Sequence, residues 1–372
     1  MKENLEEMAR QGIKTPVICG GAALNRAYVE TDLRSTYSGG QVFYGADAFT
    51  GLKLMEELTG HAAQAELTAD GDQIAERRGE MRLERESRLA EKAREYVKTD
   101  TAILDHVPTP PFWGVRHVFS RDINLSEVFT YINRMALFAN QWMYRRGKRS
   151  TSDYKSFIAD HVEPVFQTWC QRAMENAWLD PRIAYGYFPC QSEGNDLIVY
   201  SPEDPDREMC RISFPRQVAD KRRCLADYFL PRSSGRKDVV AFHVVTSGPR
   251  ASEVCQEFFK ANQYTDYLHF YGLSVETAEA LAEYWHRKIR HELGISGQDS
   301  LTIDGLLRQT YQGERFSFGY PACPNLEDQK HIFELLKPDQ IGISLSSEFQ
   351  LVPEQSTSAI IAHHPEACYF SI

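Results

Sequence analysis

The chain lacks several features that would assign it to common classes of protein. No apolar run approaches the roughly 20 residues that a membrane-spanning helix needs, and the N-terminus is charged rather than signal-like. The sequence has no G-x-S-x-G motif, no phosphate-binding P-loop and no complete dinucleotide fingerprint. Basic residues are the minority, with 42 Lys and Arg against 52 Asp and Glu. That balance argues against a surface for nucleic acid or for an anionic membrane.

Paired cysteines are also missing. The eight cysteines are scattered singly, with no C-x-x-C and no cluster of Cys and His at zinc spacing. The adjacent His363 and His364 fall on a predicted strand, where neighbouring side chains point to opposite faces. We therefore expect reduced thiols, no metal site and a cytoplasmic location.

What the chain does have is an ordinary globular composition. Hydrophobic residues make up 42% of its 372 residues and charged residues 25%. This length is enough for two domains, each with its own core.

Residues 1–65 predict two units of a parallel α/β fold. The apolar run 15–19 leads into Gly20, Gly21 and Ala22, and a second run, 41–44, leads into a turn that contains Ala48. A strand, a glycine turn and a helix, repeated, are typical of a parallel sheet. Since such a fold normally needs about five strands, we interpret this piece as an incomplete, Rossmann-like domain. The alternative is that the two units dock on the second domain.

Residues 66–118 read as a connector. About half of the residues from 66 to 98 are charged, with both signs interleaved, which predicts a solvated helix. The string V-P-T-P-P-F-W-G-V at 107–115 predicts an extended segment that Phe112 and Trp113 attach to a domain.

Residues 119–372 predict an α+β domain with a mainly antiparallel sheet and long helices. Helices are expected at 127–144, 152–177 (capped by Ser152), 252–263, 264–293 and 326–336. Strands are expected at 183–188, 196–200, 210–214, 238–246, 341–345, 356–362 and 369–372. The run 238–246 is apolar enough to be central.

The stretch 311–324, Y-Q-G-E-R-F-S-F-G-Y-P-A-C-P, is the strongest candidate for a site. It holds Arg315 beside a Gly-Tyr-Pro turn, and its prolines stiffen the backbone after Gly319. Arginine pairs with carboxylates, and a tyrosine ring can lie against a cation, so this loop suits a ligand that carries both. From spacing alone, a rigid connector with Arg315 at the surface is the simpler interpretation.

Several strings resemble the S-adenosylmethionine-binding activation domain of cobalamin-dependent methionine synthase. In order, they are Y-G-Y-F-P-x-x-x-x-G-N-D-L, C-L-A-D-Y-F, V-V-T-S-G, A-E-A-L-A-E-Y-W-H-R-K-I-R, R-x-x-x-G-Y-P-A-C-P and H-H-P-E-A-C-Y-F. Together they run over essentially all of residues 119–372.

The resemblance implies a set of ligand contacts. Arg315 would hold the carboxylate of S-adenosylmethionine, and Asn133 stands where the family frequently has an aspartate for the amino group. The set expected to bind S-adenosylmethionine is Arg315, Tyr320, Ala322, Tyr369, Phe370, Glu279 and Asn133. Tyr369 and Phe370 would close on the adenosyl part.

Residues 1–65 resemble the end of the cobalamin-binding domain of the same family. The matching residues are Gly20, Gly21, Ala22 and Ala48, whereas the D-x-H-x-x-G stretch whose histidine ligates cobalt does not occur. We therefore expect only a partial cobalamin site, and no catalytic residue in this chain.

The function implied is the reductive methylation of cob(II)alamin, within methionine biosynthesis. The expected partners are flavodoxin or a similar reductase and the portion of methionine synthase that carries the cobalamin, homocysteine and folate sites. The alternatives are a stand-alone S-adenosylmethionine-binding subunit of a split enzyme and a truncated, non-catalytic fragment. The chain by itself is not expected to make methionine.

Overall fold

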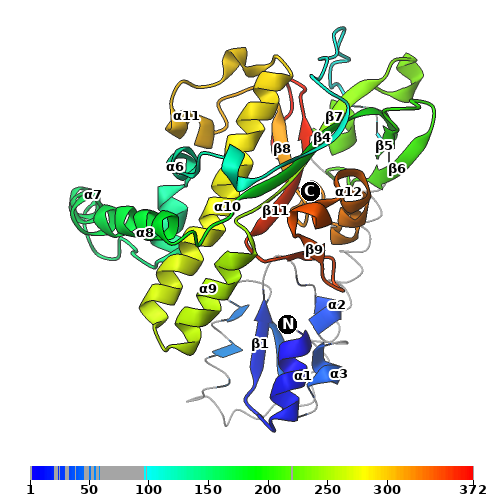
Figure 1. Ribbon diagram of the computed structural model, residues 1–372. Coiled ribbons are helices and arrows are strands. Elements are labelled where there is room, and N and C mark those ends of the chain that lie inside the picture. The colour runs from blue at the N-terminus through cyan, green and yellow to red at the C-terminus, as the bar shows by residue number, and fades with distance from the viewer. Residues whose placement is uncertain are drawn as a thin grey trace. The chain divides into compact units, whose positions relative to one another are not determined.

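The structure is a computed structural model (Figure 1). It describes residues 2–20, 24, 26–29, 33–37, 39–45, 50–51, 54–55, 58, 96–97, 99–218 and 221–371. The chain divides into two compact units, Met1–Leu89 and Ala90–Ile372, which are described separately below. Most of the predicted charged helix, residues 66–98, lies outside the described residues. The expected division at residues 65 and 118 stays a prediction.

The first unit contains the parallel strand pair that the sequence predicts. Its elements are α1 (Lys2–Arg10), β1 (Val17–Gly20), α2 (Arg26–Tyr28), α3 (Arg34–Thr36) and β2 (Val42–Gly45). The strands β1 and β2 pair in parallel, with Val17 opposite Val42. A Cβ at Gly20 would lie 2.5 Å from the Gly45 carbonyl oxygen, so a glycine is required there. The assignment of this unit to an incomplete cobalamin domain stays a prediction.

The second unit is built on a seven-stranded sheet in which every paired neighbour is antiparallel. Its strands are β3 (Gly114–Val118), β4 (Arg182–Glu193), β5 (Asp196–Tyr200), β6 (Glu208–Ser213), β7 (Asp238–Thr246), β8 (Glu314–Ser317) and β11 (Ser356–Ala362). Their order is β6-β5-β4-β7-β11-β8, and β3 pairs with the same edge of β4 as β5 does. β7 is buried at every residue, which confirms its predicted central place. The α+β class with a mainly antiparallel sheet is confirmed.

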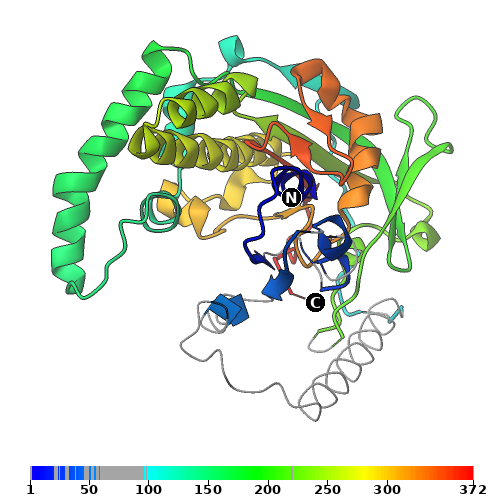
Figure 2. The same ribbon diagram turned by 90° about the horizontal axis from the view of Figure 1, so that it is seen from below.

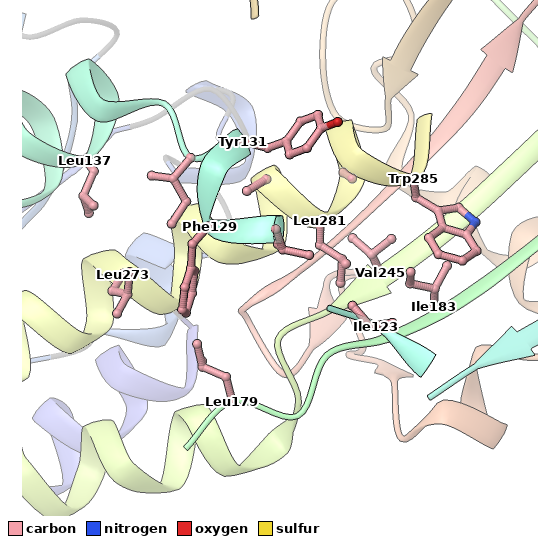
Figure 3. Packing of buried hydrophobic residues seen from close by; sticks show 14 of the residues in the cluster. Ile123, Phe129, Tyr131, Leu137, Leu179, Ile183, Val245, Leu273, Leu281 and Trp285 are labelled. Carbon is pink, nitrogen blue, oxygen red and sulfur yellow. The ribbon is translucent and has the colours of Figure 1, made fainter. Parts of the chain in front are cut away.

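Most helices of the second unit cover one face of this sheet, and one helix covers the other. The helices of the unit are α6 (Leu125–Val128), α7 (Thr151–Phe157), α8 (Glu163–Glu175), α9 (Pro249–Lys260), α10 (Tyr264–Glu292), α11 (Ile303–Leu307) and α12 (Gln329–Leu336). Alternate side chains of the strands enter two separate cores. The core under α8, α9 and α10 includes Leu281 and Trp285, which point toward Ile183 and Val245 (Figure 3). α12 covers the opposite face, as Figure 2 shows.

Two of the predicted helices are interrupted. The helix expected at 127–144 is broken after η3 (Phe129–Tyr131), because Ile132 is extended and Asn133 starts a new turn that continues as η4 (Ala136–Gln141). The helix expected at 152–177 begins at Thr151, capped by Ser150 rather than Ser152. It contains a wide π turn just before Pro164, where proline removes a backbone donor.

The edges of the sheet also differ from prediction. β3 lies in the segment expected to be a linker, and β8 lies where a loop was expected. The expected strand at 369–372 is wrong for residues 369–371, which form no strand, and residue 372 lies outside the described residues. Of the two predicted attachment points, Phe112 packs edge-on against Tyr185 and Tyr187, whereas Trp113 is exposed.

Two further expectations concern cysteines and membranes. All eight cysteines are free, and burial raises the pKa of several of their thiols, including Cys190 and Cys224. Among the described helices, none is both long and apolar enough to cross a bilayer.

Candidate functional site

The long helix α10 supplies the carboxylates of the candidate site. Its sequence is rich in alanine, leucine and glutamate, which favour helix, and small residues let it approach the sheet closely. Leu281 and Trp285 fill the core below it. Glu276, Glu279 and Glu283 follow one another at spacings of three and four residues, so they share one side of the helix.

Arg315 faces this helix from β8. It lies opposite Ile361 of β11, and Ile361 belongs to the core on the α10 side of the sheet. Since side chains alternate along a strand, Glu314 and Phe316 point to the other face. Gly313, with a φ of +85°, directly precedes the strand, and a Cβ there would lie 2.7 Å from the Ala362 carbonyl oxygen. Arg315 is thus held on a strand and not in the predicted loop.

The Arg315 guanidinium lies between two carboxylates. Its Nη1 is 3.5 Å from Glu279 Oε2 and its Nη2 is 3.8 Å from Glu283 Oε2. Burial disfavours the charged form, but Glu279 and Glu283 outweigh it and raise the pKa of Arg315. At these distances the contacts are ion pairs, and Nη1 has no hydrogen-bond partner among the described residues. A ligand carboxylate would supply the acceptor that this buried donor lacks.

Tyr320 stands beside this ion pair on a tight turn. Gly319 N donates to Cys323 O at 3.0 Å and Cys323 N donates to Tyr320 O at 2.9 Å, with Pro321 at the second turn position. The Tyr320 side chain is left 55% exposed. Partial burial raises its pKa first, and the nearby charge of Glu279 raises it further. The turn therefore presents an aromatic ring close to the carboxylates of α10.

Tyr369 and Phe370 take different places. Tyr369 is 38% exposed, and its ring stacks on Phe316 with the centroids 6.5 Å apart. Its backbone N–H donates to Glu314 Oε2 at 3.2 Å, which ties the C-terminal segment to β8. Phe370 is buried in the second core, between Tyr228 and Phe316. It supports the segment from below.

Among the described residues, no hydrogen bond or ion pair joins Ala322 or Asn133 to Arg315 or Glu279. Ala322 is fully buried in the second core. Asn133 is exposed, and its Oδ1 accepts hydrogen bonds from Met135 N and Ala136 N, both at 3.1 Å. The structure thus brings together Arg315, Glu279, Tyr320 and Tyr369 of the seven expected residues. The remaining three lie apart from this group: Ala322 and Phe370 are buried in the second core, and Asn133 is exposed on another segment.

Comparison with known proteins gives a single family. The family described as "Vitamin B12 dependent methionine synthase, activation domain" matches residues 124–372. The chain belongs to this family.

Relatives of this activation-domain family are much longer than the chain. Methionine synthase of Mycobacterium tuberculosis (strain ATCC 25618 / H37Rv) is 40% identical over 401 aligned positions, and that of Mycobacterium leprae (strain TN) is 40% identical over 403. Each alignment covers 100% of this chain and 33% of the relative. The chain therefore spans a third of the length of these curated relatives.

A solved structure of an activation domain agrees with the fold. The MetH reactivation domain bound to AdoHcy matches with a TM-score of 0.66 and 26% identity, covering 76% of this chain and 88% of that one. That protein holds S-adenosylhomocysteine, which is S-adenosylmethionine without its transferable methyl group.

Three of the four predicted cobalamin contacts are not among the described residues. Gly21, Ala22 and Ala48 lie outside the described residues. Gly20 is exposed at the end of β1, where a phosphate or nucleotide tail would approach a parallel sheet. The cobalamin site stays a prediction.

Sequence reasoning missed two acidic neighbours of Arg315. Glu283 lies one helical turn beyond Glu279, and that spacing was the only available signal. Glu314 precedes Arg315 directly and is buried, and burial raises its pKa to about 7. Its Oε1 accepts from Arg315 N at 2.9 Å.

Proposed function

We propose that this chain binds S-adenosylmethionine at the surface formed by Arg315, Glu279, Tyr320 and Tyr369, called here the Arg315 site. The observation that carries the proposal is the Arg315–Glu279 ion pair, whose Nη1 lacks a hydrogen-bond partner among the described residues. The amino-acid end of S-adenosylmethionine carries one carboxylate and one ammonium. Arg315 and Glu279 offer the opposite charges side by side, so the ligand would replace one ion pair by two.

The exposed rings suit the rest of the ligand. Tyr320 and Tyr369 are both partly exposed, and they lie close enough together that Tyr320 helps to raise the pKa of Tyr369, as Glu279 helps to raise that of Tyr320. Aromatic faces favour both a sulfonium cation and a purine ring. We assign them to the sulfonium and adenosyl parts, with Phe370 and Ala322 supporting the surface from within the core.

The proposed role is the reductive methylation of cobalamin within a larger methionine synthase. Cobalamin, held by another part of that enzyme and by Gly20 and its neighbours, would supply the methyl-accepting cobalt. The part played by this chain is positioning: it orients the sulfonium methyl and restricts its approach. Family membership and the one-third coverage of the relatives support this role and the need for the remaining domains.

A basic surface supports a reductase partner. A groove of about 790 Å³ is lined by Met135, Ala139, Asn140, Arg145, Arg146, Thr151, Tyr154, Lys155, Ile158, Ala159 and Glu163. Arg145, Arg146 and Lys155 are exposed there, and none pairs with a described acidic residue within ion-pair distance. On a chain of net charge -10, this patch fits an acidic protein such as flavodoxin. Free cysteines throughout are consistent with the cytoplasmic location that such a partner requires.

Titration calorimetry with S-adenosylmethionine tests the site. The wild-type chain should bind, Arg315→Ala should lose at least about tenfold in affinity, and Arg121→Ala should bind as wild type. Arg121 is the matched control because its side chain is 83% exposed and, within the part of the chain that the structure describes, pairs only with its neighbour Asp122. Equal affinity in all three proteins would overturn the proposal.

A further inference from the structure

Glu283 is a buried carboxylate that lies between two guanidinium groups. Its Oε2 is 3.8 Å from Arg315 Nη2, and its Oε1 is 3.9 Å from Arg290 Nη1. The Glu283 side chain is only 10% exposed. Burial raises its pKa, and Arg315 and Arg290 oppose that rise, in that order. It is therefore placed to act on Arg315 from the side opposite the solvent.

The second arginine is fixed more firmly than the first. The Arg290 side chain is fully buried, and its Nε and Nη2 donate to the carboxylate of Asp299 at 3.0 to 3.2 Å. Its guanidinium also lies over the Tyr311 ring, 3.8 Å from the centroid. Charges of alternating sign thus run from Asp299 through Arg290 and Glu283 to Arg315.

The neighbouring histidines add no charge to this row. His286 of α10 and His243 of β7 are both buried, and each has its pKa held well below the usual value, by burial first and then by Arg290 and Arg315 for His286 and by Arg315 for His243. Both imidazoles are therefore neutral at physiological pH. Glu283 supplies the negative charge between the two arginines.

The two carboxylate partners of Arg315 differ in exposure. The Glu279 side chain is 48% exposed, so water and salt screen its attraction to Arg315 and the pair costs little to give up. The Glu283 pair lies in a less polar environment, where separating the charges is costly. Glu279 is thus the exchangeable partner and Glu283 the fixed one.

We propose that Glu283 is a positioning residue, which holds the Arg315 guanidinium in the orientation that receives a ligand carboxylate while Glu279 turns to the ligand ammonium. This inference rests on the function proposed above. It separates the two glutamates by role: Glu279 contacts the ligand, whereas Glu283 acts only through Arg315. Glu283 should therefore affect ligands that carry a carboxylate and no others.

Two ligands separate these roles in binding measurements on the full chain. S-adenosylhomocysteine carries the amino-acid end, and methylthioadenosine has the same nucleoside without it. Glu283→Gln keeps the shape of the side chain and removes its charge, so it should weaken S-adenosylhomocysteine about tenfold and leave methylthioadenosine unchanged. Glu292→Gln is the matched control, since Glu292 lies on the same helix, accepts from the Tyr187 hydroxyl at 2.6 Å and is not part of the Arg315 site. It should change neither affinity.

Arg315→Ala distinguishes failure of this inference from failure of the site. If Arg315→Ala does not weaken S-adenosylhomocysteine, the proposed Arg315 site is wrong. If it does while Glu283→Gln binds as wild type, only the positioning role is overturned. If Glu283→Gln weakens the binding of methylthioadenosine as well, the variant has damaged the fold of the site, and Glu283→Asp is measured instead. Glu283→Asp keeps the buried charge but, with a shorter side chain, cannot hold Arg315 in the same place. A selective loss of S-adenosylhomocysteine in that variant supports the role, and equal effects on both ligands overturn it.

Discussion

Glu314 should make the stability of the second unit depend on pH. It is 3% exposed, and burial raises its pKa from 4.5 to about 7. Because the folded state binds this proton more tightly, the stabilisation is complete below pH 4.5 and is lost as the pH rises through about 7. A shift from 4.5 to about 7 corresponds to about 3 kcal/mol in the free energy of unfolding. Glu314→Gln cannot ionise and should remove this dependence.

Urea titrations followed by tryptophan fluorescence measure the effect. All five tryptophans lie in the second unit, so the signal reports on it alone. Glutamine keeps one acceptor and loses the other, which costs the variant about 1 kcal/mol at every pH. By pH 5 about 0.8 kcal/mol of the stabilisation by Glu314 is already lost, so we expect Glu314→Gln to be about as stable as wild type at pH 5 and about 2 kcal/mol more stable at pH 8. Parallel stability curves for the two proteins would refute the reasoning, because all other titrating groups are common to both.

Three further substitutions test the fold and the site. Gly186→Ala should lower the free energy of unfolding by about 2 kcal/mol or more in the same urea titration, since the new Cβ would lie 2.3 Å from a carbonyl oxygen of β3. Gly297→Ala, where a Cβ would meet open space, should lower it by less than about 0.5 kcal/mol. Leu281→Ala, in the core under α10, should lower the free energy of unfolding by about 2–5 kcal/mol, whereas Leu301→Ala, at a residue that is 99% exposed, should hardly change it. Equal losses in the two variants would contradict the assigned packing. Asn133→Asp keeps the capping oxygen and adds a charge, so calorimetry should show S-adenosylmethionine binding about fivefold tighter; unchanged affinity would mean that residue 133 is too far from the ammonium beside Glu279 to attract it.

The interior of the fold was predictable from the sequence because its periodicity is strong. The bounds of β7 and β11 follow from nearly continuous apolar runs, and the extent of α10 follows from a long helical repeat. The strands β3 and β8 gave no such signal. β3 follows a proline-rich segment and β8 is four residues long between glycines, so only their partners in the sheet define them.

The site was only partly predictable. Arg315 and Glu279 were expected from resemblance, and the ion pair between them places both at one surface. Helical spacing predicts that Glu283 lies on the same face of α10 as Glu279. Spacing alone does not predict that this face packs against β8, which carries Arg315. The break at Asn133 was missed because the helical pattern of apolar residues continues on both sides of it. The Asn133 side chain accepts hydrogen bonds from Met135 N and Ala136 N and so begins a new turn, but the same backbone groups could also have continued the helix, and only the packing of the whole domain decides between the two.

A crystal structure of the chain with S-adenosylhomocysteine tests the central claim most directly. The account predicts the ligand carboxylate within hydrogen-bond distance of the Arg315 guanidinium, about 2.7–3.0 Å, and the ligand ammonium beside Glu279. It also predicts that Arg315 keeps its contact with Glu283 in the complex. A ligand bound elsewhere, or an Arg315 still paired with Glu279 while the carboxylate faces solvent, would contradict it.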